Sequence, residues 1–423
     1  MPRLRTALLS LSCALAVAPN PAGAQELAAA IADALAQAPP LEAAQAGEAA
    51  AQARLARAEA ERNPLLRVEG SVGTGRLDNG GFFGIAPANV TPLAVQATTE
   101  LPLYTGGRVS AGIAQARGGA DMARLGAAQV RLQTIVQAVG TYAELLTARQ
   151  LETRANRLVA ALAEVERQAG LRFRAGEIAS SELAQARARH AEARAGLAAA
   201  EGRRESAEAA YQRLTGKPAG TLAPLPPPPV TPPSLDAALD AARQANPALH
   251  QARAAVDSAR AAVRGAAAEA MPTLGAYAEA AHIRDQFFPG YRADSIAVGL
   301  RGRWTLWSGG RVSAQSRATG AELAAAEAMA RQADQTLAGL VVDAWQGLAT
   351  ARRMAEASRL RVEAADEALR GTRLEAKVGA KPTLAVLDAE REAAEAEAAL
   401  VESEGRQVVA AWQLNALAGA LTD

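Results

Sequence analysis

The chain has 423 residues, with 45 basic and 44 acidic side chains and a formal net charge of +1. This balance gives no broad positive field, so the composition excludes a typical nucleic-acid-binding protein. Half of the residues are hydrophobic, but only 3% are aromatic, and alanine supplies most of the hydrophobic residues. Because alanine favours helix and buries little area, we expect thin helical walls rather than a thick globular core.

The first two dozen residues have the three parts of a secretory signal peptide. Arg3 and Arg5 form a basic start, an apolar run covers 7–18, and small residues end at Ala24. This order predicts cleavage after Ala24, so that 1–24 is removed on export. The run is too short to cross about 30 Å of hydrocarbon as a helix, which argues against a membrane anchor.

Cysteine chemistry is not expected in the processed chain. The single cysteine, Cys13, lies inside the predicted signal peptide, and the residues before it match a lipoprotein site poorly. We therefore expect no disulfide, no thiolate metal site and no lipid anchor. Charges interrupt the later alanine-rich stretches, so a helical membrane span is not expected either.

The first repeat is assigned to 25–216. A helix predicted at 43–62 ends before Pro64, because proline disfavours helix in the preceding residue. Two segments, 66–75 and 93–103, then alternate apolar and polar side chains, which indicates strands with one apolar face. Each is about 10 residues long, enough to cross a membrane when tilted. We predict a membrane hairpin, with a hairpin packed on a soluble core as the alternative.

The sequence GGRVSA follows the second strand. Its two glycines, Gly106 and Gly107, allow backbone angles that other residues resist, which suits a change from strand to helix. The same six residues return 309 − 106 = 203 residues later, where Gly309 and Gly310 replace the first pair. A repeated hexapeptide predicts that one structural unit occurs twice.

Each hexapeptide leads into a long helical pattern. In the first repeat the pattern covers 109–169, where large apolar residues recur at steps of three, four and seven. Such steps are typical of a narrow coiled-coil stripe. A turn at Gly176 and Glu177 separates this helix from a second one predicted at 180–214, and the matching glycine of the second repeat is Gly379.

A proline-rich segment, 217–234, joins the two repeats. Its prolines lack amide donors and favour an extended backbone, so we interpret the segment as a spacer. A proline-rich ligand for a partner protein is the alternative.

The second repeat, 235–423, has the same order of elements. A helix is predicted at 248–268, and strands are predicted at 274–284 and 296–306. Ahead of the hexapeptide the register slips by a few residues, as differences in loop length would produce. The prolines matched across this slip are Pro64 with Pro272 and Pro40 with Pro247.

Four membrane strands in one chain cannot form a closed wall. In hydrocarbon every unpaired amide or carbonyl at a sheet edge costs several kcal/mol. Barrels of a single chain need about eight strands or more, so several copies must share one wall. The strand count therefore predicts an oligomer.

The order of these elements resembles the TolC-type outer-membrane efflux proteins. The resemblance rests on the junctions LPLYTGGR and LWSGGR, the turns FRAGEIASSELAQAR and KVGAKPTLAVLDAE, and the repeat ends LTG and LAG. It implies a mainly α chain with a small transmembrane β part. The implied homotrimer forms a 12-stranded barrel in outer-membrane lipid, continuous with a periplasmic helical barrel. It also implies passive export, in which a periplasmic adaptor and an inner-membrane pump deliver the cargo.

The resemblance assigns roles to the two helical turns. It implies that the turn at Gly176 and Glu177 and the turn at Gly379 and Ala380 lie at the periplasmic tip. There they would close the tunnel and contact the adaptor. Ordinary loops, with glycine present only to end a helix, are the alternative.

The resemblance also implies a gate at the tunnel entrance. Asp388 falls where some members place an acidic ring that attracts cations, and Lys381 falls where the prototype has arginine. Ala385 and Ala376 replace an acidic residue and a tyrosine of the closing network, so this network is altered here. A solvated carboxylate on a helix face is the alternative for Asp388.

Catalysis has little support in the sequence. The histidines His190, His250 and His282 lie far apart and lack the spacing of metal ligands. We therefore expect no catalytic residues, no metal and no cofactor. The alternative function is a periplasmic coiled-coil adaptor or envelope scaffold, which would share the helices and the export signal but would not need membrane hairpins.

Overall fold

The computed structural model describes residues 26–420 apart from 79, 82–83 and 85. The predicted signal peptide and Cys13 lie outside the described residues. The described chain forms two compact units. Unit 1 comprises 26–37, 138–227 and 364–401, and unit 2 comprises 38–137, 228–363 and 402–420.

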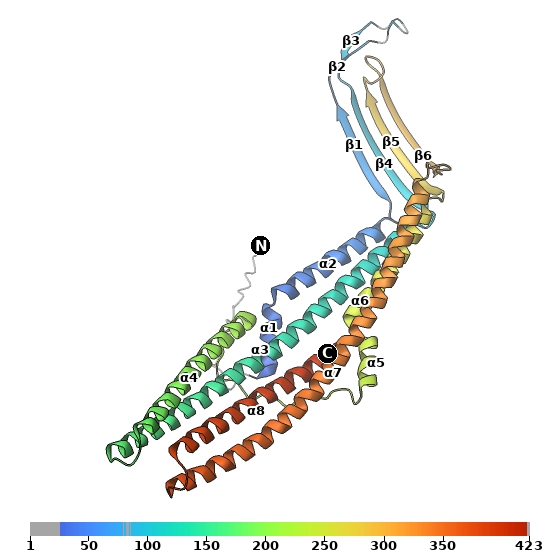
Figure 1. Cartoon of the computed structure of the whole chain (residues 1–423). Helices are drawn as coiled ribbons and strands as arrows, with labels where there is room; N and C mark the ends of the chain where they lie inside the picture. The colour runs from blue at the N-terminus through green and yellow to red at the C-terminus, as the bar shows by residue number, and fades with distance from the viewer. Residues whose placement is uncertain (1–25, 79, 82–83, 85, 421–423) are drawn as a thin grey trace, which may run out of the picture. The chain divides into compact units, whose positions relative to one another are not determined.

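The helices occur in two sets of matching length (Figure 1). The first set is α1 (Leu27–Gln37), α2 (Pro39–Ala60), α3 (Arg108–Arg174) and α4 (Ser180–Thr215), and the second is α5 (Leu235–Ala245), α6 (Pro247–Ala268), α7 (Arg311–Lys377) and α8 (Thr383–Leu417). The first three members of each set have 11, 22 and 67 residues. The predicted tandem repeat is therefore confirmed.

Two details of the predicted helices are wrong. The short helices α1 and α5 were not predicted, and α2 begins four residues before the predicted start at 43. Pro39 and Pro247 open α2 and α6, at the helix position where a missing N–H breaks no bond. The residue that matches Pro247 is therefore Pro39 and not Pro40.

Four strands form one antiparallel sheet. They are β1 (Leu65–Val72), β4 (Leu93–Tyr104), β5 (Thr273–Arg284) and β6 (Arg292–Arg303). Their order is β1-β4-β5-β6, so that the two hairpins join through β4 and β5 (Figure 1). A small second sheet, β2 (Gly75–Leu77) with β3 (Ala88–Val90), extends the first hairpin.

The strand ends differ from the prediction. The predicted strand 66–75 is interrupted after Val72, where the N–H of Gly73 donates to the carbonyl of Pro92 at 3.0 Å. The predicted strand 296–306 begins earlier, at Arg292, and ends before Trp304. The indole N–H of Trp304 instead donates to the carbonyl of Ala270, at 3.1 Å.

Each unit has its own small core. In unit 1, Leu162 of α3, Leu183 of α4 and Leu387 of α8 pack together. In unit 2, α5 to α8 form a cluster that contains the fully buried Val341 and Leu414. No helix among the described residues combines the length and the hydropathy needed to cross a membrane.

The proline-rich linker is held against the helices of unit 1. The hydroxyl of Tyr142 donates to the carbonyl of Ala223 at 2.7 Å. Arg149 donates to the carbonyls of Gly220 and Ala219, at 2.6 and 3.1 Å. Burial raises the pKa of the Tyr142 phenol, so it stays a neutral donor at physiological pH.

The second half of the linker has similar contacts in unit 2. Arg352, which lies 203 residues after Arg149, donates to the hydroxyl of Thr231 at 3.1 Å. The side-chain amide of Asn415 donates to the carbonyl of Val230 at 2.8 Å. The matched arginines of the two repeats therefore hold the two ends of the linker.

Candidate functional site

The turn between α3 and α4 is a glycine-capped helix end. Gly176 has a φ of 76°, and its N–H donates to the carbonyl of Phe173 at 3.0 Å. The N–H of Glu177 donates to the carbonyl of Arg172 at 2.9 Å. These two bonds form a Schellman motif, which favours glycine because other residues are strained at this φ. The Glu177 carboxylate also pairs with Arg172, at 3.3 Å.

The turn between α7 and α8 has the same backbone. Gly379 has a φ of 79°, and the N–H of Ala380 donates to the carbonyl of Glu375 at 2.8 Å. The ammonium of Lys381 lies 2.8 Å from the carboxylate of Glu375. Lys381 thus pairs with an acid on the preceding helix, whereas Asp388 has a different partner.

Exposed apolar side chains lie next to both turns. Leu171 and Phe173 precede the first turn with 46% and 40% of their surface exposed. Leu374 and Val378 precede the second with 64% and 80% exposed. Four large apolar side chains are therefore exposed at the two helix ends. The sequence analysis identified the glycines but missed these residues.

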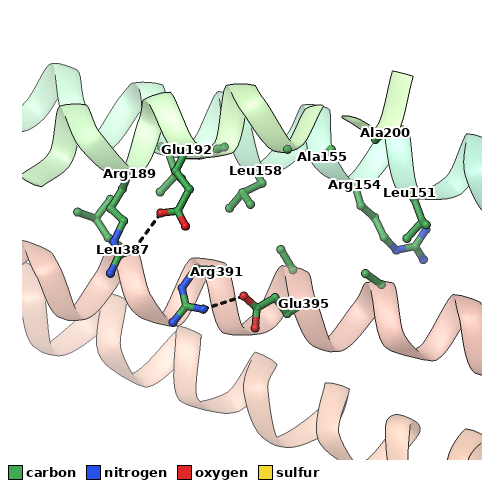
Figure 2. Close-up of a pocket in the computed structure, with 15 residues that line it drawn as sticks. Leu151, Arg154, Ala155, Leu158, Arg189, Glu192, Ala200, Leu387, Arg391 and Glu395 are labelled. Atoms are coloured by element: carbon green, nitrogen blue, oxygen red, sulfur yellow. Dashed lines mark hydrogen bonds and ion pairs between the residues drawn. The ribbon is translucent and has the colours of Figure 1, made fainter. Parts of the chain in front are cut away.

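A cleft of about 310 Å³ lies between α3, α4 and α8 within unit 1 (Figure 2). Its apolar lining includes Leu158 of α3 and Leu387 of α8. Figure 2 shows charged side chains from two helices at this cleft, Arg189 and Glu192 from α4 and Arg391 from α8. The cleft brings the helical hairpin of the first repeat against the last helix of the second.

Asp388 lies beside this cleft and is already paired. Its carboxylate accepts a hydrogen bond from Arg189 of α4, with 3.4 Å between the atoms. Arg189 also pairs with Glu192, at 2.9 Å. The Asp388 side chain is 46% exposed, so this ion pair is screened by solvent.

The remaining charges of the cleft are compensated as well. Arg391 pairs with Glu395 at 2.7 Å, and this hydrogen bond raises the pKa of the arginine. Arg154 of α3 lies 3.0 Å from Glu397 of α8. Arg154 and Glu397 are distant in the sequence and meet only through helix packing, so periodicity within one helix could not reveal that pair.

The junction glycines adopt the expected unusual conformations. Gly106 and Gly107 have φ values of 61° and 93°, and Gly309 and Gly310 have 61° and 85°. A Cβ added to Gly106 would lie 2.4 Å from the Cβ of Met271, whereas one added to Gly309 would meet no atom within 4 Å. The first junction is therefore tightly packed within the chain, and the second is open.

The three histidines each have a separate partner. His190 contacts Glu166 at 2.7 Å, His282 contacts Asp294 at 2.6 Å, and His250 contacts a backbone carbonyl. Within the described residues, no three histidine, cysteine or acidic side chains gather in a way that could hold a metal ion. The absence of a metal site from the whole chain stays a prediction.

Known structures share this fold. The outer-membrane channel OprN matches with a TM-score of 0.80 and 21% identity, covering 93% of this chain and 89% of OprN. The outer membrane protein VceC of Vibrio cholerae matches with a TM-score of 0.80 and 20% identity, covering 93% and 96%. The CmeC outer membrane channel of Campylobacter jejuni matches with a TM-score of 0.81 and 14% identity, covering 93% and 85%. At these identities the likeness shows the fold.

Sequence comparison identifies the family. Outer membrane efflux protein BepC of Brucella suis biovar 1 (strain 1330) is 29% identical over 291 residues. This match covers 68% of the chain and 64% of BepC, so it spans less than two thirds of that relative. A family model described as outer membrane efflux protein matches residues 30–217 and 238–420. Because the model covers both repeats, this chain belongs to the outer membrane efflux protein family, a family of outer-membrane transport proteins and not of enzymes.

Proposed function

We propose that three copies of this chain form an outer-membrane exit duct. The duct passes cargo without chemistry of its own, from a periplasmic adaptor and an inner-membrane pump to the exterior. Family membership supports the efflux role and decides against the periplasmic scaffold. Residues 25–216 and 235–423 are the two repeats of each copy, and 217–234 is the linker.

The main support for an oligomer is that the four-stranded sheet has two open edges. β1 and β6 lie at the ends of the strand order, and every residue of β1 is exposed. The exposed side chains of β1 include Leu66, Val68 and Val72, each at least 65% exposed. In hydrocarbon such edges cost several kcal/mol for each unpaired backbone group, so other copies must cover them. Three copies supply twelve strands, the number that the TolC-type resemblance implies.

We place adaptor docking at the two glycine turns. The supporting features are their matching backbone and the exposed apolar residues beside them, Phe173 and Val378 among them. Glu177 and Ala380 lie at the first positions after the two glycines, where a docked helix would contact them.

We assign Asp388 to a cation-attracting ring at the entrance of the duct, and Lys381 to the altered closing network beside it. Three carboxylates near one axis would attract multivalent cations. Arg189 partly neutralises Asp388 within each copy. This pairing makes the charge of the ring adjustable by substitution at either residue.

Single-channel recording in planar bilayers tests both the duct and the Asp388 ring. We expect the purified protein to give a stable conductance that multivalent cations block. Asp388→Ala should weaken this block, and Arg189→Ala should strengthen it because the carboxylate loses its partner. Failure to form any stable conductance would contradict the duct. Equal block in the native protein and both variants would contradict the ring alone.

A further inference from the structure

We infer the register in which the edge strands of neighbouring copies pair along a seam, an inference that rests on the proposed oligomeric duct. In this seam α7 and β6 of one copy contact α2 and β1 of a second copy of this chain. Arg303 then lies opposite Glu69 and Arg301 lies opposite Ser71. The contacts between the two repeats of one chain are the template for the contacts between copies.

Matching positions of α3 and α7 differ in burial. Ala111 of α3 is 4% exposed, but the matching Ala314 of α7 is exposed. Gly118 of α3 is buried, and the matching Ala321 of α7 is exposed. The buried positions of α3 face α6, because a Cβ on Gly118 would lie 2.8 Å from the Cβ of Ser258. The corresponding face of α7 therefore lacks the neighbour that α3 has.

Matching positions of α6 and α2 differ in the same way. Within the chain α6 meets α3 through Ser258 and meets α7 through the pair of Arg260 with Glu327, at 3.4 Å. Ala261 of α6 has no exposed surface, whereas the matching Ala53 of α2 is exposed. Because α2 matches α6 and α7 matches α3, the open faces of α2 and α7 can form between copies the contact that α6 and α3 form within one chain.

The hairpins give the register of the seam. Leu65 lies opposite Glu100 in the first hairpin, and Thr273 lies opposite Arg303 in the second. A residue of β1 therefore matches the residue of β5 that lies 273 − 65 = 208 positions later. A residue of β4 matches the residue of β6 that lies 303 − 100 = 203 positions later. The second offset equals the offset of the hexapeptide.

The pairing of β4 with β5 then predicts the pairing of β6 with the next β1. Glu100 of β4 lies opposite Tyr277 of β5. Adding 203 to the position of Glu100 in β4 gives Arg303 in β6. Subtracting 208 from the position of Tyr277 in β5 gives Glu69 in β1. The predicted pairing is antiparallel, as required for an even number of strands.

The side chains along the two edge strands agree with this register. Arg303 has no carboxylate partner among the described residues, and Glu69 has only a loose one, Arg67 at 3.7 Å. The seam places these opposite charges across from each other, which stabilises a strand pair. It also places Leu300 opposite Val72, and both side chains are exposed in the single chain.

Other registers are less favourable. A slip of one residue would place the apolar face of one strand beside the polar face of the other. A slip of two residues in one direction would place Arg301 opposite Glu69 but Arg303 opposite Arg67, a like-charge pair. A slip of two in the other direction would place Arg303 opposite Ser71 and leave the seam without an ion pair.

Disulfide trapping in outer membranes tests the register. Cys13, the natural cysteine, is replaced by serine, and cysteines are introduced as Ser71→Cys with Arg301→Cys. Directly opposite residues have Cβ atoms close to disulfide distance, so mild oxidation should link neighbouring copies into dimers and trimers on non-reducing gels. The matched control is Gly73→Cys with Arg301→Cys, which retains the Arg303–Glu69 pair and tests the slipped register; a Cβ on Gly73 meets no atom within 4 Å. We expect the control to react about tenfold more slowly.

The possible outcomes test the proposed seam and the proposed duct independently. Faster linkage of the opposite pair supports the seam. Faster linkage of the control, or no linkage in a protein that still migrates as an oligomer on native gels, overturns the seam and leaves the proposed function standing. A protein that is monomeric on native gels in both variants and in the Cys13→Ser parent overturns the proposed function as well.

Discussion

At the scale of single residues, the repeated glycines have different surroundings in the two halves of the chain. Gly106 and Gly309 share a φ of 61°, but only Gly106 has a neighbour, Met271, that would collide with a side chain. The sequence predicted the strand-to-helix junction because glycine tolerates such angles. It could not predict the collision, because Met271 approaches from the other repeat.

The first prediction concerns this junction. Gly106→Ala should destabilise the protein by roughly 2–4 kcal/mol, because it adds strain at positive φ to an overlap with Met271. The matched control is Gly112→Ala in α3, where a Cβ meets no atom within 4 Å. The control should be neutral or stabilise the helix by about 0.5–1 kcal/mol. Thermal unfolding followed by circular dichroism measures both, and equal stability of the two variants would refute the steric account.

At the scale of elements, the linker depends on a few donors and is not a free spacer. Arg149 uses one guanidinium to hold two linker carbonyls and the carboxylate of Glu208, at 2.9 Å. Its match in the second repeat, Arg352, holds Thr231. Proline content alone predicts an extended backbone but not the surface on which it lies.

The second prediction concerns this linker. Arg149→Ala should free the segment around Leu222, which is 8% exposed, so that thermolysin cuts there at least about fivefold faster. Arg157→Ala is the control, because Arg157 is an exposed arginine of the same helix. Equal cutting of the two variants would show that Arg149 does not hold the linker.

The elements that could be predicted are those with a local signal. Period-two alternation located the hairpins, and helical spacing with Gly176 and Gly379 located the long helices and their turns. The helix starts were missed where proline opens a helix, as at Pro39. The pairing of Asp388 with Arg189 joins residues 199 positions apart, so no local pattern could reveal it.

At the scale of the whole molecule, β1 and β6 each have a paired strand on one side only among the described residues. The sheet ends in two open edges, and matched helix faces are buried in one repeat and exposed in the other. Both features are expected of a chain whose neighbours are further copies of itself. The family match agrees with an outer-membrane duct, while the number of copies is our proposal.

The most direct measurement of the central claim is native mass spectrometry of the protein extracted from outer membranes in mild detergent. We predict one dominant species with three times the mass of the processed chain, and its loss only on denaturation. A dominant single-chain species under the same conditions would mean that the edges of β1 and β6 are covered in another way, and the duct built from shared strands would be wrong.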